Sequence, residues 1–289
     1  MNGILLVDKE QTWTSSDVVV KLKGILRQRR VGHAGTLDPM ATGLLVVFAG
    51  RATRAVEFAE RDSKRYLASL RLGTVTDTQD VWGTVLEKNS ADVGRDELEA
   101  ALKRFRGAQE QLPPMYSAVK VNGRKLCDVA RRGGEVERRP RGIVIHELTL
   151  LGRNGEDWLL DIRCSKGTYI RTLCHDIGQA LGCGGCMSAL RRTEAGGFSV
   201  ENALTISDIQ ALADAGELEE RLLPVDRLFA GNEMCRVSSE EEKKLRCGSD
   251  FPTALPNGDY RVYGASGDFL MLGRAEDGRM RTVKSFFEV

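Results

Sequence analysis

The chain alternates short apolar runs with polar, glycine-rich and charged segments, and each run has the length of one strand or one face of a helix. Residues 3–7 form an apolar run that predicts a buried strand. Apolar positions recur at helical spacing over residues 18–26, which predicts a helix with Ser15 or Ser16 as its N-cap. Residues 64–88 alternate apolar and polar positions around two glycines, which predicts a hairpin.

Similar patterns continue through the middle of the chain. Residues 90–107 have the spacing of an amphipathic helix, and Gly107 is expected to close it. Residues 142–152 predict a strand, and residues 157–182 predict a strand, a loop and a helix. Residues 203–222 predict a helix with an acidic exposed face. The order of these elements predicts an α+β domain in which helices and strands are mixed.

The pattern changes near Cys235. From there the sequence consists of short alternating runs divided by glycine and Asp-Gly pairs, which are typical of β-hairpins. A chain of 289 residues is long enough for one large domain and one small domain. We therefore expect a small all-β domain after the mixed domain.

Composition and charge narrow the class of protein. Hydrophobic residues make up 42% of the chain, enough for a sizeable core, and no apolar run is long enough for a transmembrane helix. The N-terminus lacks the pattern of a secretion signal, and seven irregularly spaced cysteines indicate a reducing cytoplasm. The net charge is +1, but the first 200 residues carry +7 and residues 201–233 carry −6. A polyanionic partner is therefore plausible for the first part of the chain.

One carboxylate, Asp38, stands alone in the segment VGHAGTLDPMATGLLVVFAG, residues 31–50. A phosphate-binding loop is disfavoured because both of its usual glycine motifs are absent. Two interpretations remain open. The Asp38-Pro39 pair can form a turn whose carboxylate caps backbone N–H groups. Alternatively, Asp38 is a catalytic acid in a loop whose glycines allow backbone or substrate to approach closely.

A partner for Asp38 occurs in SKGTYIRTL, residues 165–173. Tyr169 and Arg171 are two residues apart and would share one face of a strand. A buried Arg171 would hold a carboxylate ionised through paired hydrogen bonds, whereas the alternative is a surface arginine at the start of a helix. Tyr66, in SKRYLASLRLG, is either a core tyrosine or a ring that stacks on a base.

The stretch from Lys120 to Arg141 contains eight basic residues and three acids. Such a stretch is either a solvated face or an arginine-rich loop that contacts phosphates. Its basic residues are Lys120, Arg124, Lys125, Arg131, Arg132, Arg138, Arg139 and Arg141.

The cysteines offer weak evidence for a metal site. Cys183 and Cys186 have C-x-x-C spacing, and Cys164 and Cys174 precede them. The second close pair that a structural zinc site usually needs is missing. The local sequence also lacks the pattern of a catalytic Cys–His–Asp group. We therefore predict no metal site.

Four segments, in chain order, resemble the motifs of the tRNA pseudouridine synthase B family. They are GHAGTLDPMATGLLVV, KRYLASLRLG, QLPPMYSAVKVNGRKL and SKGTYIRTL, followed by LRRT at residues 190–193. The resemblance runs from about Gly3 to Thr193. It implies a largely antiparallel central sheet with flanking helices and an active-site cleft across its middle. The C-terminal β segment resembles a small barrel-like RNA-binding PUA domain.

The resemblance implies an isomerase that converts uridine 55 in the T-loop of tRNA to pseudouridine. The bond from C1′ to N1 breaks, the base turns, and C1′ joins C5. The target base must first be flipped out of its stack, at a cost of a few kcal/mol. The implied partner is the T stem-loop of tRNA. The resemblance implies no cofactor, no metal, no membrane and no obligatory protein partner, and it suggests a monomer.

The resemblance also implies roles for individual residues. Asp38 matches the catalytic aspartate, which acts as nucleophile at the sugar or the base, or as base at the 2′ carbon. Tyr66 matches the tyrosine that stacks on the flipped base, and Arg171 matches the arginine that pairs with the aspartate. His33 belongs to the group that fills the vacated stack. Further substrate contacts are implied for Tyr169, Leu190, Lys120, Arg131, Arg132, Arg138 and Arg139.

The implied division places a catalytic domain at residues 1–232, with a basic RNA-binding insertion at about 115–142, and a PUA-like domain at 233–289. Cys127 stands where family members commonly have an aromatic residue, so the packing of the insertion is in question. The Cys- and Gly-rich residues 182–187 have no assigned role. Two other functions remain open. One is an RNA-binding chaperone in which catalysis is secondary; the other is the catalytic subunit of a guide-RNA particle, which the basic insertion disfavours.

Overall fold

The long apolar runs form one large sheet in the computed structural model, which describes residues 1–60, 63–117, 119–121 and 123–287. The strand order is β1-β3-β12-β4-β11-β10-β7, with β2 beside β3 and β13 beside β12. These strands are β1 (Gly3–Lys9), β2 (Val31–Ala34), β3 (Thr42–Ala49), β4 (Lys64–Leu72), β7 (Gly107–Gln111), β10 (Arg141–Asn154), β11 (Asp157–Cys164), β12 (Gly185–Ala195) and β13 (Phe198–Ser199). Within the described chain, β12 and β3 form the one parallel pair of this sheet, which confirms the expected largely antiparallel arrangement.

Strands β1 and β3 are apolar on both faces because other elements cover both faces. Leu5 and Val7 of β1 pack under α1 (Ser15–Ile25) and α6 (Ile206–Ala215). Ile4 and Leu6 point to the opposite face, where 3-10 helices at Gly50–Ala55 and Val225–Phe229 and the short helix α2 (Val56–Ala59) lie. Successive side chains of a strand alternate between faces, so a strand covered on both sides has a continuous apolar sequence.

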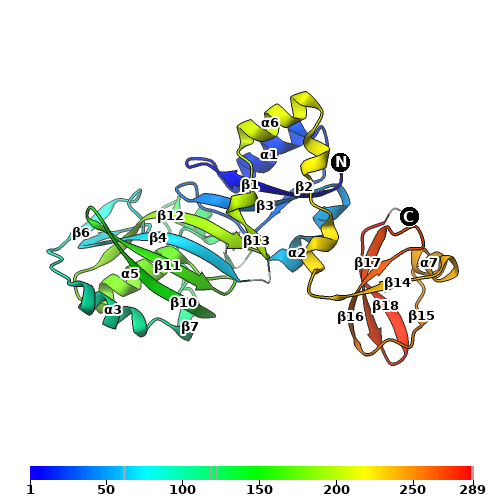
Figure 1. Cartoon of the computed structure of the whole chain (residues 1–289). Helices are drawn as coiled ribbons and strands as arrows, with labels where there is room; N and C mark the ends of the chain where they lie inside the picture. Colours follow the sequence, from blue (N-terminus) through cyan, green and yellow to red (C-terminus); the bar gives the residue numbers. More distant parts are fainter. Residues whose placement is uncertain (61–62, 118, 122, 288–289) are drawn as a thin grey trace.

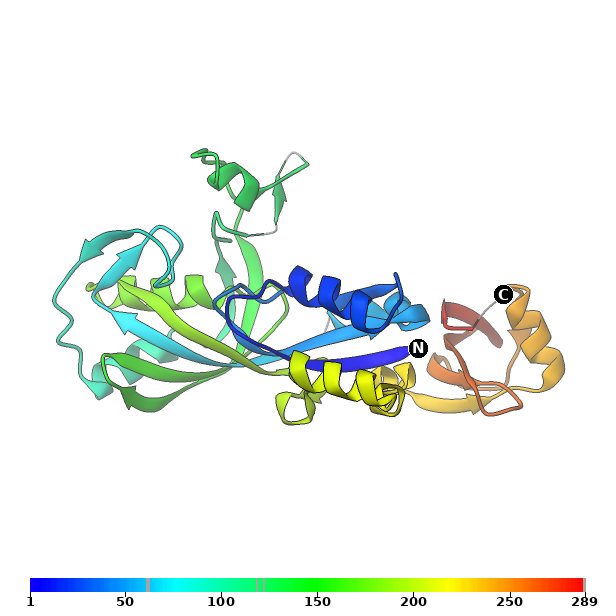
Figure 2. The same cartoon turned by 90° about the horizontal axis from the view of Figure 1, so that it is seen from above.

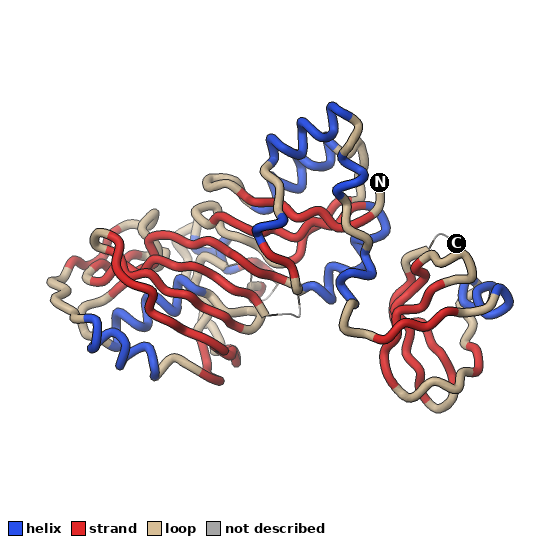
Figure 3. The backbone as a smooth tube through the Cα atoms, in the orientation of Figure 1, coloured by secondary structure: helices blue, strands red, loops and turns tan. Residues whose placement is uncertain are grey.

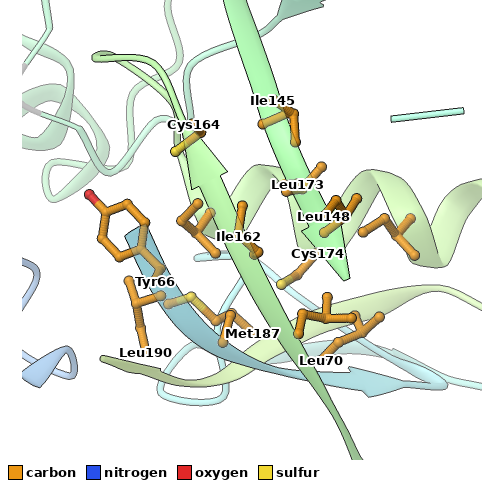
Figure 4. Close-up of a cluster of buried hydrophobic side chains, with 14 of the residues drawn as sticks. Tyr66, Leu70, Ile145, Leu148, Ile162, Cys164, Leu173, Cys174, Met187 and Leu190 are labelled. Carbon is orange, nitrogen blue, oxygen red and sulfur yellow. The ribbon is translucent and has the colours of Figure 1, made fainter. Parts of the chain in front are cut away.

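The other half of the sheet packs against two helices. α3 (Arg95–Lys103) contributes Leu98 and Leu102, and α5 (Ile170–Ala180) contributes Leu173 and Ile177. These side chains meet apolar residues of β4, β10, β11 and β12 in one buried cluster (Figure 4).

Two smaller hairpins extend from the sheet. One joins β5 (Thr74–Thr76) to β6 (Val85–Lys88), and the other joins β8 (Lys120–Val121) to β9 (Arg124–Lys125), followed by α4 (Leu126–Ala130). Figure 2 shows that the segment with β8, β9 and α4 (green) projects from the same side of the sheet as the β5–β6 hairpin (cyan).

The last part of the chain forms a second sheet in the order β14-β16-β17-β18-β15. Its elements are β14 (Glu233–Arg236), α7 (Ser239–Arg246), β15 (Phe251–Pro252), β16 (Gly258–Tyr263), β17 (Phe269–Glu276) and β18 (Arg279–Ser285). In Figures 1 and 2 this unit lies at the end of the molecule remote from α3 and β7. The helix α7 departs from the all-β prediction, although strands dominate the unit (Figure 3).

Two predicted helix boundaries were wrong. The N-cap of α1 is Thr14, whose hydroxyl accepts a hydrogen bond from the Asp17 amide while the Asp17 carboxylate accepts one from the Thr14 amide. This capping box satisfies two backbone donors and so outcompetes the neighbouring serines. Helix α3 ends at Lys103, and Gly107 begins β7 instead of closing the helix. Among the described residues, no helix has the length and apolarity needed to cross a bilayer.

Candidate active site

Asp38 lies in the loop between β2 and β3, and this loop is tied down on both sides of it. The Leu37 amide donates to the Ser15 hydroxyl at 2.9 Å, and the Thr12 amide donates to the Pro39 carbonyl at 2.8 Å. Leu37 and Met40 are each only 3% exposed. The Asp38 side chain, in contrast, remains 38% exposed. The loop therefore holds a solvent-accessible carboxylate between two buried side chains, on a backbone fixed by hydrogen bonds.

Arg171 is the partner that the structure places beside Asp38. Its Nε lies 2.9 Å from Asp38 Oδ2, although the Arg171 side chain is only 5% exposed. Its Nη1 donates to the Thr78 carbonyl at 3.0 Å and its Nη2 to the Tyr116 carbonyl at 2.8 Å. Asp80 Oδ2 lies 3.6 Å from Nη1. All three guanidinium nitrogens are engaged, so Arg171 is fixed in the orientation that faces Asp38.

The predicted strand geometry of Tyr169 and Arg171 was wrong. Tyr169 is the N-cap of α5, and Arg171 lies in the first turn of this helix. The Gln111 side chain fixes the cap, because its Nε2 donates to the Tyr169 carbonyl at 3.0 Å and its Oε1 accepts from the Tyr169 amide at 2.8 Å. Arg171 thus starts a helix, as one of the open interpretations held, but it is buried instead of lying on the surface.

Tyr66 lies on β4 at the margin of the buried cluster. Figure 4 shows its hydroxyl directed away from the other labelled side chains, among which is Leu190 of β12. Tyr66 is 7% exposed and Leu190 is 8% exposed. Burial raises the pKa of Tyr66, and the nearby positive charge of Arg192 partly opposes that rise. The phenol therefore keeps its proton at neutral pH.

A row of paired residues crosses the sheet beside this site. Lys9 of β1 pairs with Gly43 of β3, Gly43 pairs with Arg192 of β12, and Arg192 pairs with Tyr66 of β4. Gly43 has a φ of +97°, and an added Cβ would lie 2.3 Å from the Arg192 carbonyl oxygen. Glycine is therefore required where β3 and β12 approach each other most closely.

Two cations of this row are completely buried. Arg192 is 0% exposed, and its Nε donates to the Leu44 carbonyl at 2.7 Å and its Nη2 to the Gly35 carbonyl at 2.9 Å. Lys9 is also 0% exposed, and its Nζ donates to the carbonyls of Glu10 and Trp13. Burial lowers the pKa of Lys9 to about 8; the negative charge of Asp38 opposes this effect and Arg192 adds to it.

His33 lies on β2, where it pairs with Val47 of β3. Its Nδ1 is buried and has no hydrogen-bond partner within the described residues. Burial lowers the pKa of His33, and the positive charge of Arg192 lowers it further. The imidazole is therefore neutral at pH 7.

The basic residues of the insertion have different environments. Arg131, Arg132 and Arg139 are exposed, whereas the Arg138 side chain is 20% exposed and its Nη1 donates to the Pro113 carbonyl at 3.1 Å. Arg138 therefore anchors the insertion to its base. The side chain of Lys120 falls outside the described part of the structure. Cys127 is partly buried at the start of α4.

The cysteines are free thiols. Cys164, Cys174, Cys183 and Cys186 are buried, and burial raises the pKa of Cys164 and of Cys186 to about 11. Within the described residues, His, Cys, Asp and Glu form no group of three or more that is placed to hold a metal ion. Gly184 and Gly185 instead pack closely against α5, because an added Cβ on Gly178 would lie 2.2 Å from the Gly185 nitrogen.

Comparison with known proteins identifies the family. A model described as TruB family pseudouridylate synthase (N terminal domain) matches residues 23–170, and one described as tRNA pseudouridylate synthase B C-terminal domain matches residues 171–230. The chain belongs to the TruB family. Pseudouridine synthases are isomerases, so the Asp38 site lies in an enzyme of that class.

Full-length relatives of the TruB family cover nearly the whole chain. The tRNA pseudouridine synthase B of Syntrophomonas wolfei is 41% identical over 290 residues, covering 98% of this chain and 96% of its own. The tRNA pseudouridine synthase B of Chromobacterium violaceum is 41% identical over 289 residues, and the match covers 98% of this chain and 94% of the relative's own length. A solved chain of a Cbf5-Nop10-Gar1 complex superposes with a TM-score of 0.76 at 26% identity, covering 99% of this chain and 85% of its own.

The sequence did not single out Lys9, Asp80 or Arg192. Lys9 ends an apolar strand, and Arg192 lies in LRRT, but neither position showed which strands would become neighbours. Asp80 stands in a polar turn together with Asp77 and Thr78, and the sequence does not show which of these side chains would contact Arg171. Pairings between distant strands align Lys9 and Arg192 in one row. Asp80 lies 3.6 Å from Arg171, which contacts Asp38.

Proposed function

We propose that this protein isomerises uridine 55 in the T-loop of tRNA to pseudouridine, with Asp38 as the essential catalytic residue. The observation that carries the proposal is the exposed Asp38 carboxylate, 2.9 Å from a buried Arg171, in a chain of the TruB family. The curated relatives with about 40% identity carry the name tRNA pseudouridine synthase B, which supports tRNA as the substrate class.

The reaction needs a group that acts at the sugar or base and a pocket that admits one nucleotide. Asp38 supplies that group, and Arg171 keeps it ionised and oriented. Tyr66 stacks on the flipped base, Tyr169 and Leu190 line the pocket, and His33 fills the space that the base has left. The C1′–N1 bond breaks, the C1′–C5 bond forms, C5 loses a proton and N1 gains one. Atoms and electrons balance within the substrate, so the proposed reaction needs no oxidant, reductant or group donor, and we propose that it uses no cofactor.

The same proposal assigns RNA binding to two further parts of the chain. Residues 1–232 form the catalytic domain, and its insertion at about 115–142 holds the T stem-loop through Lys120, Arg131, Arg132, Arg138 and Arg139. Residues 233–289 form a PUA-like RNA-binding domain with a barrel-like sheet. The protein acts as a cytoplasmic monomer without an obligatory protein partner.

Tritium release from C5-labelled uridine in a tRNA transcript tests the proposal. We expect release with the native protein, no release with Asp38→Asn, and similar tRNA affinity for both, because amide and carboxylate have nearly the same size. A transcript with cytidine at position 55 is the substrate control and should release no tritium. Turnover by Asp38→Asn at the native rate would exclude the assignment of Asp38.

The same experiment separates the enzyme from an RNA chaperone. A protein that refolds tRNA without releasing tritium would support the chaperone function and contradict the proposed one. Refolding is followed with a misfolded transcript, and both Asp38→Asn and native protein are assayed on it.

A further inference from the structure

The hairpin formed by β5 and β6 carries a large exposed aromatic side chain. Trp82 lies in the turn between the two strands and is 53% exposed. The other two tryptophans differ from it, since Trp158 is 7% exposed and Trp13 is partly buried. Exposing a tryptophan face to water forgoes a large favourable burial energy. An exposed tryptophan at a rigid turn is therefore available to bind a partner.

The turn that carries Trp82 is fixed to the candidate active site. The Trp82 amide donates to Asp80 Oδ1 at 3.0 Å, and Asp80 Oδ2 lies 3.6 Å from Arg171 Nη1. Arg171 Nε in turn lies 2.9 Å from Asp38 Oδ2. Three contacts thus connect the backbone of Trp82 to the Asp38 carboxylate, so the turn that carries Trp82 contacts the same arginine as Asp38 does.

Further hydrogen bonds make this turn rigid. The Thr76 hydroxyl donates to the Asp80 carbonyl at 2.7 Å, and the Thr172 hydroxyl of α5 donates to Gln79 Oε1 at 2.8 Å. Asp80 also forms an isolated β-bridge with Met187 of β12. The backbone is thereby ordered before any ligand arrives, so binding at Trp82 costs little additional conformational entropy.

We propose that Trp82 stacks on an unpaired nucleobase of the substrate RNA, next to the uridine that enters the Asp38 site. The inference rests on the proposed function, which brings a single-stranded RNA loop to this site. Unpaired loop bases are recognised chiefly by stacking on aromatic side chains, and each base offers two π faces. The insertion with its exposed arginines projects from the same side of the sheet (Figure 2), where it would hold the phosphates while Trp82 holds a base.

The proposal predicts a loss of binding without a loss of chemistry. Stacking is worth about 1–3 kcal/mol per base, so Trp82→Ala should raise KM and the dissociation constant for a T stem-loop RNA by about 5- to 160-fold, with kcat unchanged. Trp82→Phe keeps an aromatic face and should restore most of the affinity. Leu86→Ala is the matched control, because Leu86 is 62% exposed on the same hairpin and should leave KM unchanged.

Two readouts separate stacking from a structural role. Trp82→Ala keeps the backbone amide that binds Asp80, so a fall in kcat at saturating RNA would indicate damage to Arg171 and contradict the proposal. Tryptophan fluorescence should be quenched by RNA in the native protein and much less in Trp82→Phe. Binding is measured by anisotropy, independently of turnover, so native protein that binds RNA but releases no tritium would contradict only the proposed reaction. Unchanged affinity in Trp82→Ala would overturn the stacking proposal.

Discussion

Arg171 shows how one residue joins separate parts of this site. Its guanidinium contacts Asp38 from the β2–β3 loop, Thr78 and Asp80 from the turn of the β5–β6 hairpin, and Tyr116 from the base of the insertion. A lysine at this position would carry the same charge from one atom and could not reach these groups simultaneously. The geometry of Arg171, more than its charge, therefore determines how the site is assembled.

Lys9 gives the protein a predictable pH dependence. Burial lowers its pKa from 10.5 to about 8, so the folded protein binds this proton more weakly than the unfolded chain does. Below pH 8, Lys9 is protonated in both the folded and the unfolded protein. Between pH 8 and 10.5, Lys9 is protonated mainly in the unfolded protein. The contribution of Lys9 to stability therefore rises with pH through this range, by on the order of 3 kcal/mol.

Lys9→Met removes this contribution. We expect the difference in unfolding free energy between native protein and Lys9→Met to shift in favour of the native protein as the pH rises from 7.5 to 9.5, in urea denaturation followed by circular dichroism. Using the difference cancels the titration of the cysteines, whose raised pKa values act in the opposite direction. A difference that stays constant with pH would contradict the prediction.

The sequence predicted the isolated acid and its distant arginine but not the buried cations. Asp38 was visible because its segment holds no other carboxylate, and a resemblance to family motifs directed attention to Arg171. Lys9 and Arg192 could not be predicted as neighbours of the site, because strand pairing alone brings them together. The row from Lys9 to Tyr66 joins four strands from different parts of the chain. The whole fold decides which of these distant strands become neighbours, so the sequence around Lys9 or Arg192 alone does not show it.

The insertion carries a prediction at the scale of one element. Replacing Arg131, Arg132 and Arg139 by glutamine should weaken tRNA binding and reduce the slope of log K against log salt by about 2, because each exposed arginine releases counterions from phosphates. Binding measured from 50 to 300 mM salt gives the slope directly. An unchanged slope would show that the insertion does not contact phosphates.

Arg138→Gln provides the contrast. Arg138 is held by the Pro113 carbonyl and lies 3.6 Å from Glu135, so its loss should increase the protease sensitivity of the insertion. It should change the salt slope by less than one third of the change in the triple variant.

The contact between β3 and β12 carries the next prediction. Gly43→Ala should destabilise the protein by at least about 2 kcal/mol, because it combines a positive φ with a clash against the backbone of Arg192. Gly142→Ala on β10 is the control, since nothing lies within 4 Å of its added Cβ. Chemical denaturation of both variants provides the comparison. Equal stability of the two would exclude steric crowding at Gly43.

Helices and strands were predictable where the apolar pattern repeated over many residues, but the residues at which these elements begin and end were not. The spacing over residues 18–26 correctly indicated α1, but its start depended on a reciprocal bond between Thr14 and Asp17. The alternation around residues 64–88 correctly indicated β4, β5 and β6. The segment with Tyr169 and Arg171 was too short for periodicity to distinguish a strand from the first turn of a helix, and the Gln111 side chain on a remote strand decides it.

At the scale of the whole molecule, an aromatic cluster joins the second sheet to the rest of the protein. The ring centroid of Phe286 lies 5.9 Å from that of Phe229 and 5.3 Å from that of Phe269. Phe286 is 3% exposed. Phe286→Ala should cost about 3–5 kcal/mol at this junction and separate the unfolding of residues 233–287 from that of the first sheet. Calorimetry should then show two transitions. Persistence of the native transition would contradict the prediction.

Lys284→Gln tests the polar part of the same junction. Its ammonium lies 2.7 Å from Glu57, but the two side chains are 35% and 51% exposed. An exposed ion pair contributes at most about 1 kcal/mol, so this variant should unfold almost as the native protein does.

The position of β12 between β3 and β4 determines when the protein can become active during its synthesis. Until residues 185–195 leave the ribosome, β1 and β3 form one piece of sheet and β4, β10 and β11 form another, with exposed strand edges facing each other. Arg192 arrives with β12, and its pairings with Gly43 and Tyr66 complete the row between Lys9 and Tyr66. Long-range pairing of this kind closes late in folding. A nascent chain that still lacks β12 therefore cannot hold a finished site, and RNA chemistry is confined to chains that have closed the sheet.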